Sequence, residues 1–167
     1  MKPEIFWIPG LPPGGRLGIM ARPRSGEWLR DEVAGWCSVG LSSVVCLLEA
    51  AEARELGLED EAMLCESSRI EFISFPISDR GVPSSVERTT QLVERLLASL
   101  RNGSSVAIHC RAGIGRSSLI AGCVLLALGF PEREIFPRLS RARGLQVPDT
   151  ATQVAWLTRF GQIYSRP

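Results

Sequence analysis

One cysteine and one arginine bracket a short segment that contains two glycines. Cys110 and Arg116 are separated by five residues, Arg-Ala-Gly-Ile-Gly. Gly113 and Gly115 permit backbone angles that other residues resist, so successive N–H groups can turn toward one point and bind an anion. The start of the helix expected from Arg116 onward would attract an anion as well. A thiol and a guanidinium at one anion site predict attack of sulfur on a phosphate ester.

This chemistry requires that the Cys110 thiol lose its proton near neutral pH. An unperturbed thiol has a pKa of about 8.5, but amides, helix N-termini and nearby cations lower it to roughly 3.5–7.5. The thiolate could then form a phosphocysteine. Arg116 offers two parallel donors to the phosphate and to the transition state, and the Ser117 hydroxyl could support the thiolate. The residues between them form the expected substrate-binding segment: Arg111, Ala112, Gly113, Ile114 and Gly115.

The remaining cysteines and the histidine indicate no metal chemistry. His109 is the only histidine, and five cysteines occur without paired spacing. We therefore expect neither a zinc site nor a disulfide framework, and no cofactor. His109 directly precedes Cys110, and we expect its ring to orient the loop through hydrogen bonds without transferring protons. Cys46, on a predicted strand beside that of Cys110, is a candidate redox partner for it.

The segments that must position the loop alternate between strand and helix, which predicts an α/β fold with a mostly parallel central sheet and helices on both faces. Ligands bind at the carboxyl ends of such strands, where the loop lies. Residues 17–21 are expected at the sheet edge, Ser84 as a helix N-cap, and Pro137 as a point where a helix starts late or kinks. The expected strands are 4–8, 17–21, 42–48, 70–77 and 105–108, and the expected helices 27–38, 49–56, 59–67, 84–101, 116–128, 131–142 and one from about 150.

Length and composition suit a single domain over residues 1–167. A net charge of +1 predicts no general attraction to nucleic acid or to an anionic membrane. The chain opens without a signal-peptide pattern, and its longest apolar run, 119–130, is too short to span a bilayer. We expect a cytoplasmic protein, and the sequence does not indicate its oligomeric state.

The stretch His-Cys-x5-Arg-Ser resembles the signature of the cysteine-dependent protein tyrosine phosphatases. In the dual-specificity branch of that superfamily, the resemblance implies a general-acid aspartate about thirty residues before the cysteine. Asp79, within Phe75-Pro-Ile-Ser-Asp-Arg-Gly-Val-Pro83, precedes Cys110 by 31 residues. The resemblance therefore implies that Asp79 protonates the leaving oxygen.

The same segment and the helix after it are similar to small dual-specificity phosphatases of the kinase-associated type. This resemblance implies a three-layer sandwich, a reaction without metal, and Gln153 as the residue that positions the hydrolytic water. A phosphoprotein or phosphopeptide is the expected substrate. No segment resembles the phosphotyrosine-recognition loop of the larger, tyrosine-specific enzymes, which favours a shallow pocket that admits phosphoserine and phosphothreonine as well as phosphotyrosine. Arg111 is also the only extra cation within the loop, which disfavours polyphosphorylated lipids.

Two alternatives stay open from the sequence. The same scaffold could hydrolyse a phosphoinositide, a nucleotide or an RNA 5′-phosphate, with Arg111, Arg141 and Arg143 serving the polyanion. A non-catalytic module that binds phosphopeptides would need only the loop and Arg116.

Overall fold

A single sheet carries the candidate loop at one end. The computed structural model describes residues 2–164, and the strands within this range pair in the order β1-β2-β5-β3-β4. Neighbouring strands run parallel, except that β1 is antiparallel to β2. The mostly parallel sheet predicted from the sequence is therefore confirmed. The strands are β1 (Phe6–Trp7), β2 (Arg16–Met20), β3 (Ser43–Cys46), β4 (Glu71–Ser74) and β5 (Ser105–His109).

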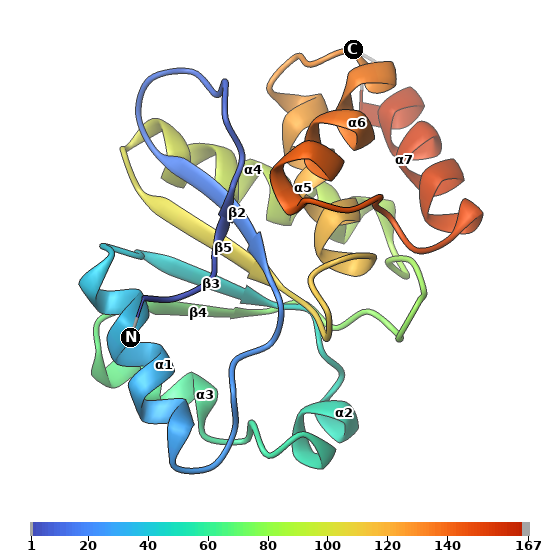
Figure 1. The fold of residues 1–167 in the computed structure, drawn as a ribbon. Coiled ribbons are helices and arrows are strands. Elements are labelled where there is room, and N and C mark those ends of the chain that lie inside the picture. Colours follow the sequence, from blue (N-terminus) through green and yellow to red (C-terminus); the bar gives the residue numbers. More distant parts are fainter. Residues whose placement is uncertain (1, 165–167) are drawn as a thin grey trace.

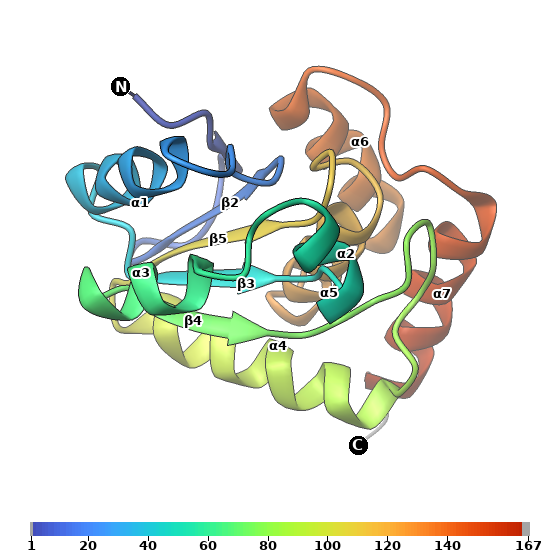
Figure 2. The ribbon, with the colours of Figure 1, turned by 90° about the horizontal axis from the view of Figure 1, so that it is seen from below.

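Helices cover both faces of the sheet (Figure 1). Helices α1 and α3 lie over one face, and α4 and α5 over the other (Figure 2). Helix α5 is buried at every residue from Arg116 to Leu125, and α6 and α7 pack against it. No helix within residues 2–164 is long and apolar enough to cross a bilayer. The helices are α1 (Trp28–Ser38), α2 (Ala50–Glu55), α3 (Glu61–Ser67), α4 (Val86–Arg101), α5 (Arg116–Ala127), α6 (Glu132–Arg143) and α7 (Ala151–Tyr164).

The central strands have the continuous apolar sequences that burial on both faces requires. All five residues of β5 are buried, as are all four of β3. Val45 and Ile108 face the apolar cluster beneath α4 and α5, whereas Cys46 and Ala107 face the cluster beneath α1 and α3. The sheet thus separates two cores, and β5 contributes side chains to both.

Residues 17–21 do not form an edge strand, contrary to the prediction. β1 pairs with β2 through Phe6–Ile19 and Trp7–Gly18. A Cβ atom at Gly18 would come within 2.5 Å of the Ile5 side chain and 3.0 Å of the Trp7 ring. The missing side chain of Gly18 therefore lets β1 lie close against β2 and cover it.

The N-cap of α4 was predicted wrongly, and α6 does not start late, contrary to one of the two expectations for Pro137; the other, a kink at Pro137, stays a prediction. The N-cap of α4 is Ser85, whose hydroxyl accepts a hydrogen bond from the Arg88 amide at 3.1 Å, and not Ser84. Pro137 lies inside α6, which continues on both sides of it. A mid-helix proline removes one backbone hydrogen bond, but Ile135 and Leu139 on the same helix are fully buried. Burial of these two side chains favours the helical conformation on both sides of the proline.

Candidate active site

The loop of residues 110–115, hereafter the Cys110 loop, begins where β5 ends and leads directly into α5. Neighbouring strands end at the same level, since His109 pairs with Met20 on β2 and with Cys46 on β3. Gly113 has φ +69, and a Cβ atom there would lie 2.6–2.7 Å from backbone atoms of Met20 and Ala21. Only glycine fits this position, both by its backbone angle and by the space available.

The Cys110 sulfur is buried and surrounded by hydrogen-bond donors. Cys110 is 3% exposed, and its Sγ is 3.3 Å from the Ser117 hydroxyl oxygen. Burial raises the pKa of this thiol, but hydrogen bonds from the Ser117 hydroxyl and from the amides of Ser117, Ile114 and Gly113 lower it further than burial raises it. The net pKa of Cys110 is below its ordinary value, which favours a reactive thiolate.

Arg116 is buried and held by two segments, helix α2 and the segment that follows β4. Its guanidinium binds the Glu52 carboxylate with two hydrogen bonds of 2.8 and 2.9 Å, and the Ile77 carbonyl with one of 2.9 Å. The hydrogen bonds to Arg116 lower the pKa of Glu52, although burial opposes this. The guanidinium is therefore oriented before any ligand arrives.

Glu52 was not predicted as a site residue. It lies in α2, just beyond the carboxyl end of β3, and that position is the one signal the sequence offers. Its side chain is 10% exposed, whereas Glu55 at the end of the same helix is exposed.

Asp79 reaches the same guanidinium from the segment that follows β4. Its Oδ1 lies 3.1 Å from the Arg116 Nη2, and its side chain is 56% exposed. Cys110, Ser117, Arg116 and Asp79 therefore gather at one point, although their roles in catalysis stay predictions.

Gln153 is fully buried in the first turn of α7. Its Oε1 accepts hydrogen bonds from the amides of Asp149 and Thr150 at 3.1 and 3.2 Å, and its Nε2 donates to the Gly81 carbonyl at 3.1 Å. Gln153 thus ties α7 to the segment that carries Asp79. These contacts indicate a structural tether, and the water-positioning role stays a prediction.

His109 forms a buried pair with Glu61, another residue that sequence patterns did not indicate. Its Nε2 is 2.7 Å from Glu61 Oε1, and its Nδ1 is 3.2 Å from the Cys110 carbonyl oxygen. Both ring nitrogens face oxygen acceptors, which suits a ring protonated at both positions. Burial lowers the pKa of His109, but Glu61 and Cys46 raise it well above the ordinary value.

Cys46 completes this buried cluster and is poorly placed to bond with Cys110. Ligand atoms of Cys46, Glu61 and His109 lie within 4.8 Å of one another. A 2.7 Å hydrogen bond already joins His109 to Glu61, so the cluster fits an internal hydrogen-bond network better than a metal site.

Cys46 packs beneath α1 and α3, whereas Cys110 belongs to the core on the other face of the sheet. This placement does not support the predicted redox partnership.

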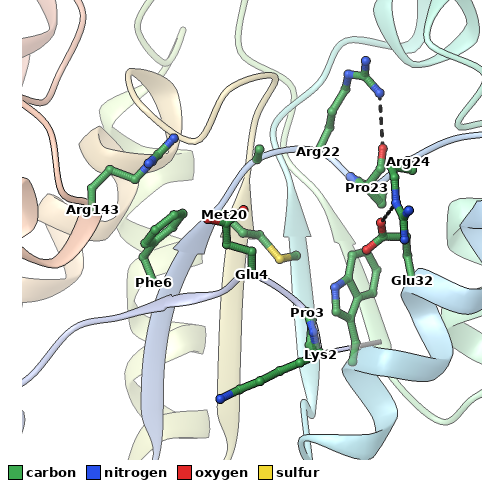
Figure 3. A pocket seen from close by; sticks show the side chains of 12 residues that line it. Lys2, Pro3, Glu4, Phe6, Met20, Arg22, Pro23, Arg24, Glu32 and Arg143 are labelled. Carbon is green, nitrogen blue, oxygen red and sulfur yellow. Dashed lines mark hydrogen bonds and ion pairs between the residues drawn. The ribbon is translucent and has the colours of Figure 1, made fainter.

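A cavity of about 400 Å³ is lined by Arg22 and Arg143, two residues that hydrogen-bond to carbonyls of the Cys110 loop. Figure 3 shows Arg143 with Phe6 at one end of the cavity, and Arg24 with Glu32 at the other. The Arg22 amide donates to the Arg111 carbonyl at 3.2 Å, which joins the cavity wall to the loop. The other lining residues are Lys2, Pro3, Glu4, Met20, Ala21, Pro23 and Trp36.

Comparisons with known proteins agree with this geometry. Human cyclin-dependent kinase inhibitor 3 is 36% identical over 88 residues, which cover 51% of this chain and 41% of that protein. The chain therefore matches less than half the length of this relative. A crystal structure of kinase-associated phosphatase, with its catalytic cysteine replaced by serine, superposes with a TM-score of 0.90 at 22% identity and covers 100% of this chain and 99% of that one.

A crystal structure of PTPMT1 in complex with PI(5)P superposes with a TM-score of 0.72 at 17% identity, covering 90% of this chain and 91% of that chain. At such identities the structural matches establish the fold, and the α/β sandwich expected from the sequence is confirmed. A family model described as PTP-SAK, Swiss Army Knife protein, DSP-PTPase phosphatase domain, matches residues 11–160. The chain therefore belongs to this family of dual-specificity-type phosphatase domains.

Proposed function

We propose that this chain is a cysteine-dependent phosphatase that hydrolyses phosphotyrosine in proteins, and also phosphoserine and phosphothreonine. The proposal rests on the surroundings of the Cys110 thiol. The amides of Gly113, Ile114 and Ser117 lower the pKa of this thiol. The Arg116 guanidinium lies near the sulfur and also contacts Asp79. A nucleophile, an anion-binding guanidinium and a proton donor are thus available together.

In the first step, the Cys110 thiolate attacks phosphorus and forms an S–P bond as the P–O bond to the substrate breaks. The loop amides and Arg116 stabilise the equatorial oxygens. Protonated Asp79 gives its proton to the leaving oxygen, which departs as an alcohol or phenol. Asp79 is suited to this task by its position at the mouth of the site, where half of its side chain faces solvent.

In the second step, water attacks the phosphocysteine and the S–P bond breaks. Asp79, now ionised, accepts a proton from this water, so that phosphate leaves and the acid is restored. The Ser117 hydroxyl, 3.3 Å from the sulfur, stabilises the departing thiolate. Gln153 orders the segment that carries Asp79 through its hydrogen bond to Gly81.

A phosphoinositide phosphatase is the second candidate. The cavity beside the Cys110 loop includes Lys2, Arg22, Arg24 and Arg143 among its lining residues, and these could bind additional phosphates. Glu4 and Glu32 line the same cavity. Glu32 forms an ion pair with Arg24, and Arg143 already donates to the Gly113 carbonyl. Fewer of these cations are therefore available to a polyanion, so the phosphoprotein is the preferred substrate.

The decisive experiment compares substrates side by side. Peptides with phosphotyrosine, phosphoserine or phosphothreonine, phosphoinositide vesicles and 5′-phosphorylated RNA are incubated with wild type and with Cys110→Ser. We expect turnover of the peptides by wild type only, and retained phosphate binding by Cys110→Ser because the amides and Arg116 remain. Faster turnover of the lipid would replace the phosphoprotein assignment, and near-wild-type activity of Cys110→Ser would exclude the thiolate mechanism.

A further inference from the structure

The outer side of the Cys110 loop is held by one arginine. Arg143 donates from Nε to the Gly113 carbonyl at 3.0 Å and from Nη2 to the Ala112 carbonyl at 3.1 Å. Arg143 is the last residue of α6, and its guanidinium carbon lies 4.3 Å from the ring centre of Phe6 (Figure 3). Arg143, which stacks on Phe6 of β1, therefore holds the loop by two of its backbone carbonyl groups.

The two peptide units that Arg143 contacts also carry N–H groups that face the nucleophile. The amides of Gly113 and Ile114 lie close enough to the Cys110 sulfur to lower the pKa of its thiol. In a trans peptide unit, the N–H and the C=O point in opposite directions. Arg143 thus binds the carbonyl ends of two dipoles whose amide ends point at the sulfur. A cation in this position polarises both amides and opposes their rotation.

We propose that Arg143 is a positioning residue that fixes the peptide units Ala112–Gly113 and Gly113–Ile114 with their N–H groups toward the sulfur and the bound phosphate. The catalytic meaning of this role rests on the proposed phosphatase function. Gly113 stands between the two units, and glycine has the fewest steric restrictions of any residue. The hydrogen bonds from Arg143 therefore restrict backbone rotation at Gly113, a residue at which the loop would otherwise have wide conformational freedom.

The role can be measured on the thiol itself, because iodoacetate reacts with the thiolate form. The experiment uses a Cys37→Ser background, since Cys37 is the exposed cysteine and the other four are buried. The rate of Cys110 alkylation is measured against pH, and peptide mass spectrometry identifies the modified residue. Arg143→Met removes the hydrogen bonds to the loop, Arg143→Lys keeps the charge, and Arg141→Met removes an exposed arginine from the same helix.

The other charged groups around the thiol are the same in all these variants, so a difference in pH dependence reports the change at position 143. Those groups are the following: Arg116 with its partners Glu52 and Asp79, His109 with its partner Glu61, the exposed Arg111 on the loop itself, and Asp149, whose carboxylate lies next to Gly115.

We expect the alkylation midpoint of Arg143→Met to lie about one pH unit above that of wild type, equivalent to a tenfold lower thiolate fraction below the midpoint. The kcat/KM for nitrophenyl phosphate should fall roughly 10- to 100-fold, less than for direct loss of an oxyanion donor. Arg143→Lys should recover part of both effects, because an ammonium reaches one carbonyl but lacks the planar fork. Arg141→Met should match wild type.

An unchanged midpoint in a folded Arg143→Met protein overturns the proposal, even if activity falls. An equal shift in Arg141→Met overturns it too, because the effect would then be general electrostatics. Circular dichroism checks folding, and Arg143→Gln replaces the methionine variant if that variant unfolds, with the same expectations. A wild-type protein without turnover would refute the proposed function, whereas the alkylation midpoints would still decide the role of Arg143.

Discussion

Replacing Glu52 with glutamine tests whether the buried pair with Arg116 holds the site together. The substitution keeps the shape of the side chain and removes the charge that faces two guanidinium nitrogens at 2.8 and 2.9 Å. Removing one partner of a buried ion pair costs about 3–5 kcal/mol of unfolding free energy. Arg116 keeps the Ile77 carbonyl and Asp79 as partners. We therefore expect a loss near the lower end, about 3 kcal/mol.

In a chain of this length, such a loss lowers Tm by roughly 6–12 °C. Thermal and urea unfolding measure it, and kcat/KM for nitrophenyl phosphate should fall because Arg116 loses its fixed orientation. Glu55→Gln is the matched control, since this exposed residue lies in the same helix. Its substitution should change the unfolding free energy by no more than about 0.5 kcal/mol.

The pH dependence of the unfolding free energy is a second test of the Glu52–Arg116 pair. Arg116 lowers the pKa of Glu52 below its ordinary value of 4.5 in the folded protein. The ionised pair therefore stabilises the fold above that value, and the stabilisation is lost as pH falls through the folded pKa. The difference in unfolding free energy between wild type and Glu52→Gln should be largest at pH 7 and should decrease as the pH is lowered. A gap below about 1 kcal/mol at pH 7, or one equal to that of Glu55→Gln, would refute the reasoning.

Two further substitutions test the site. Asp79→Asn should lower kcat/KM about 10²- to 10⁴-fold with phosphoserine, whose alkoxide leaves poorly, and much less with nitrophenyl phosphate; equal small losses in steady-state kinetics would remove Asp79 from the role of acid. Gly113→Ala should destabilise the fold and abolish turnover, because the new Cβ would meet the Met20 backbone at 2.6 Å. Gly129→Ala is its control, with φ +96 but open space, and should cost only about 1–2 kcal/mol in urea unfolding; equal costs would contradict the steric argument.

The sequence indicated the parts of the site that are local in the chain. Cys110, Arg116 and Ser117 are neighbours whose loop conformation depends on nearby glycines, and the apolar segments on either side predict the strand and the helix. The spacing of Asp79 before the cysteine came from the family resemblance, and the structure places its carboxylate against Arg116. These features follow from patterns that span a few residues, or from a known motif.

The partners of those residues could not be predicted, because tertiary packing selects them. Glu52 binds Arg116 across 64 positions, and Glu61 binds His109 across 48. Both glutamates lie in short helices whose charged sequences are typical of solvent-exposed segments. The sequence suggested Arg143 only as a residue that could serve a polyanionic substrate, whereas its guanidinium binds loop carbonyls 30 and 31 positions away. No local pattern distinguishes such a residue from an exposed one.

The place of β5 in the sheet has a consequence for the kinetics of folding. β5 is the last strand in sequence, yet it lies between β2 and β3, and its partner Arg16 is 89 positions from Ser105. Pairing across such separations requires closure of long loops and slows folding. The Cys110 loop has its neighbours only after both pairings are complete. The return of the proposed activity during refolding therefore reports completion of both pairings of β5, and a species without β2 or β3 in place would be inactive.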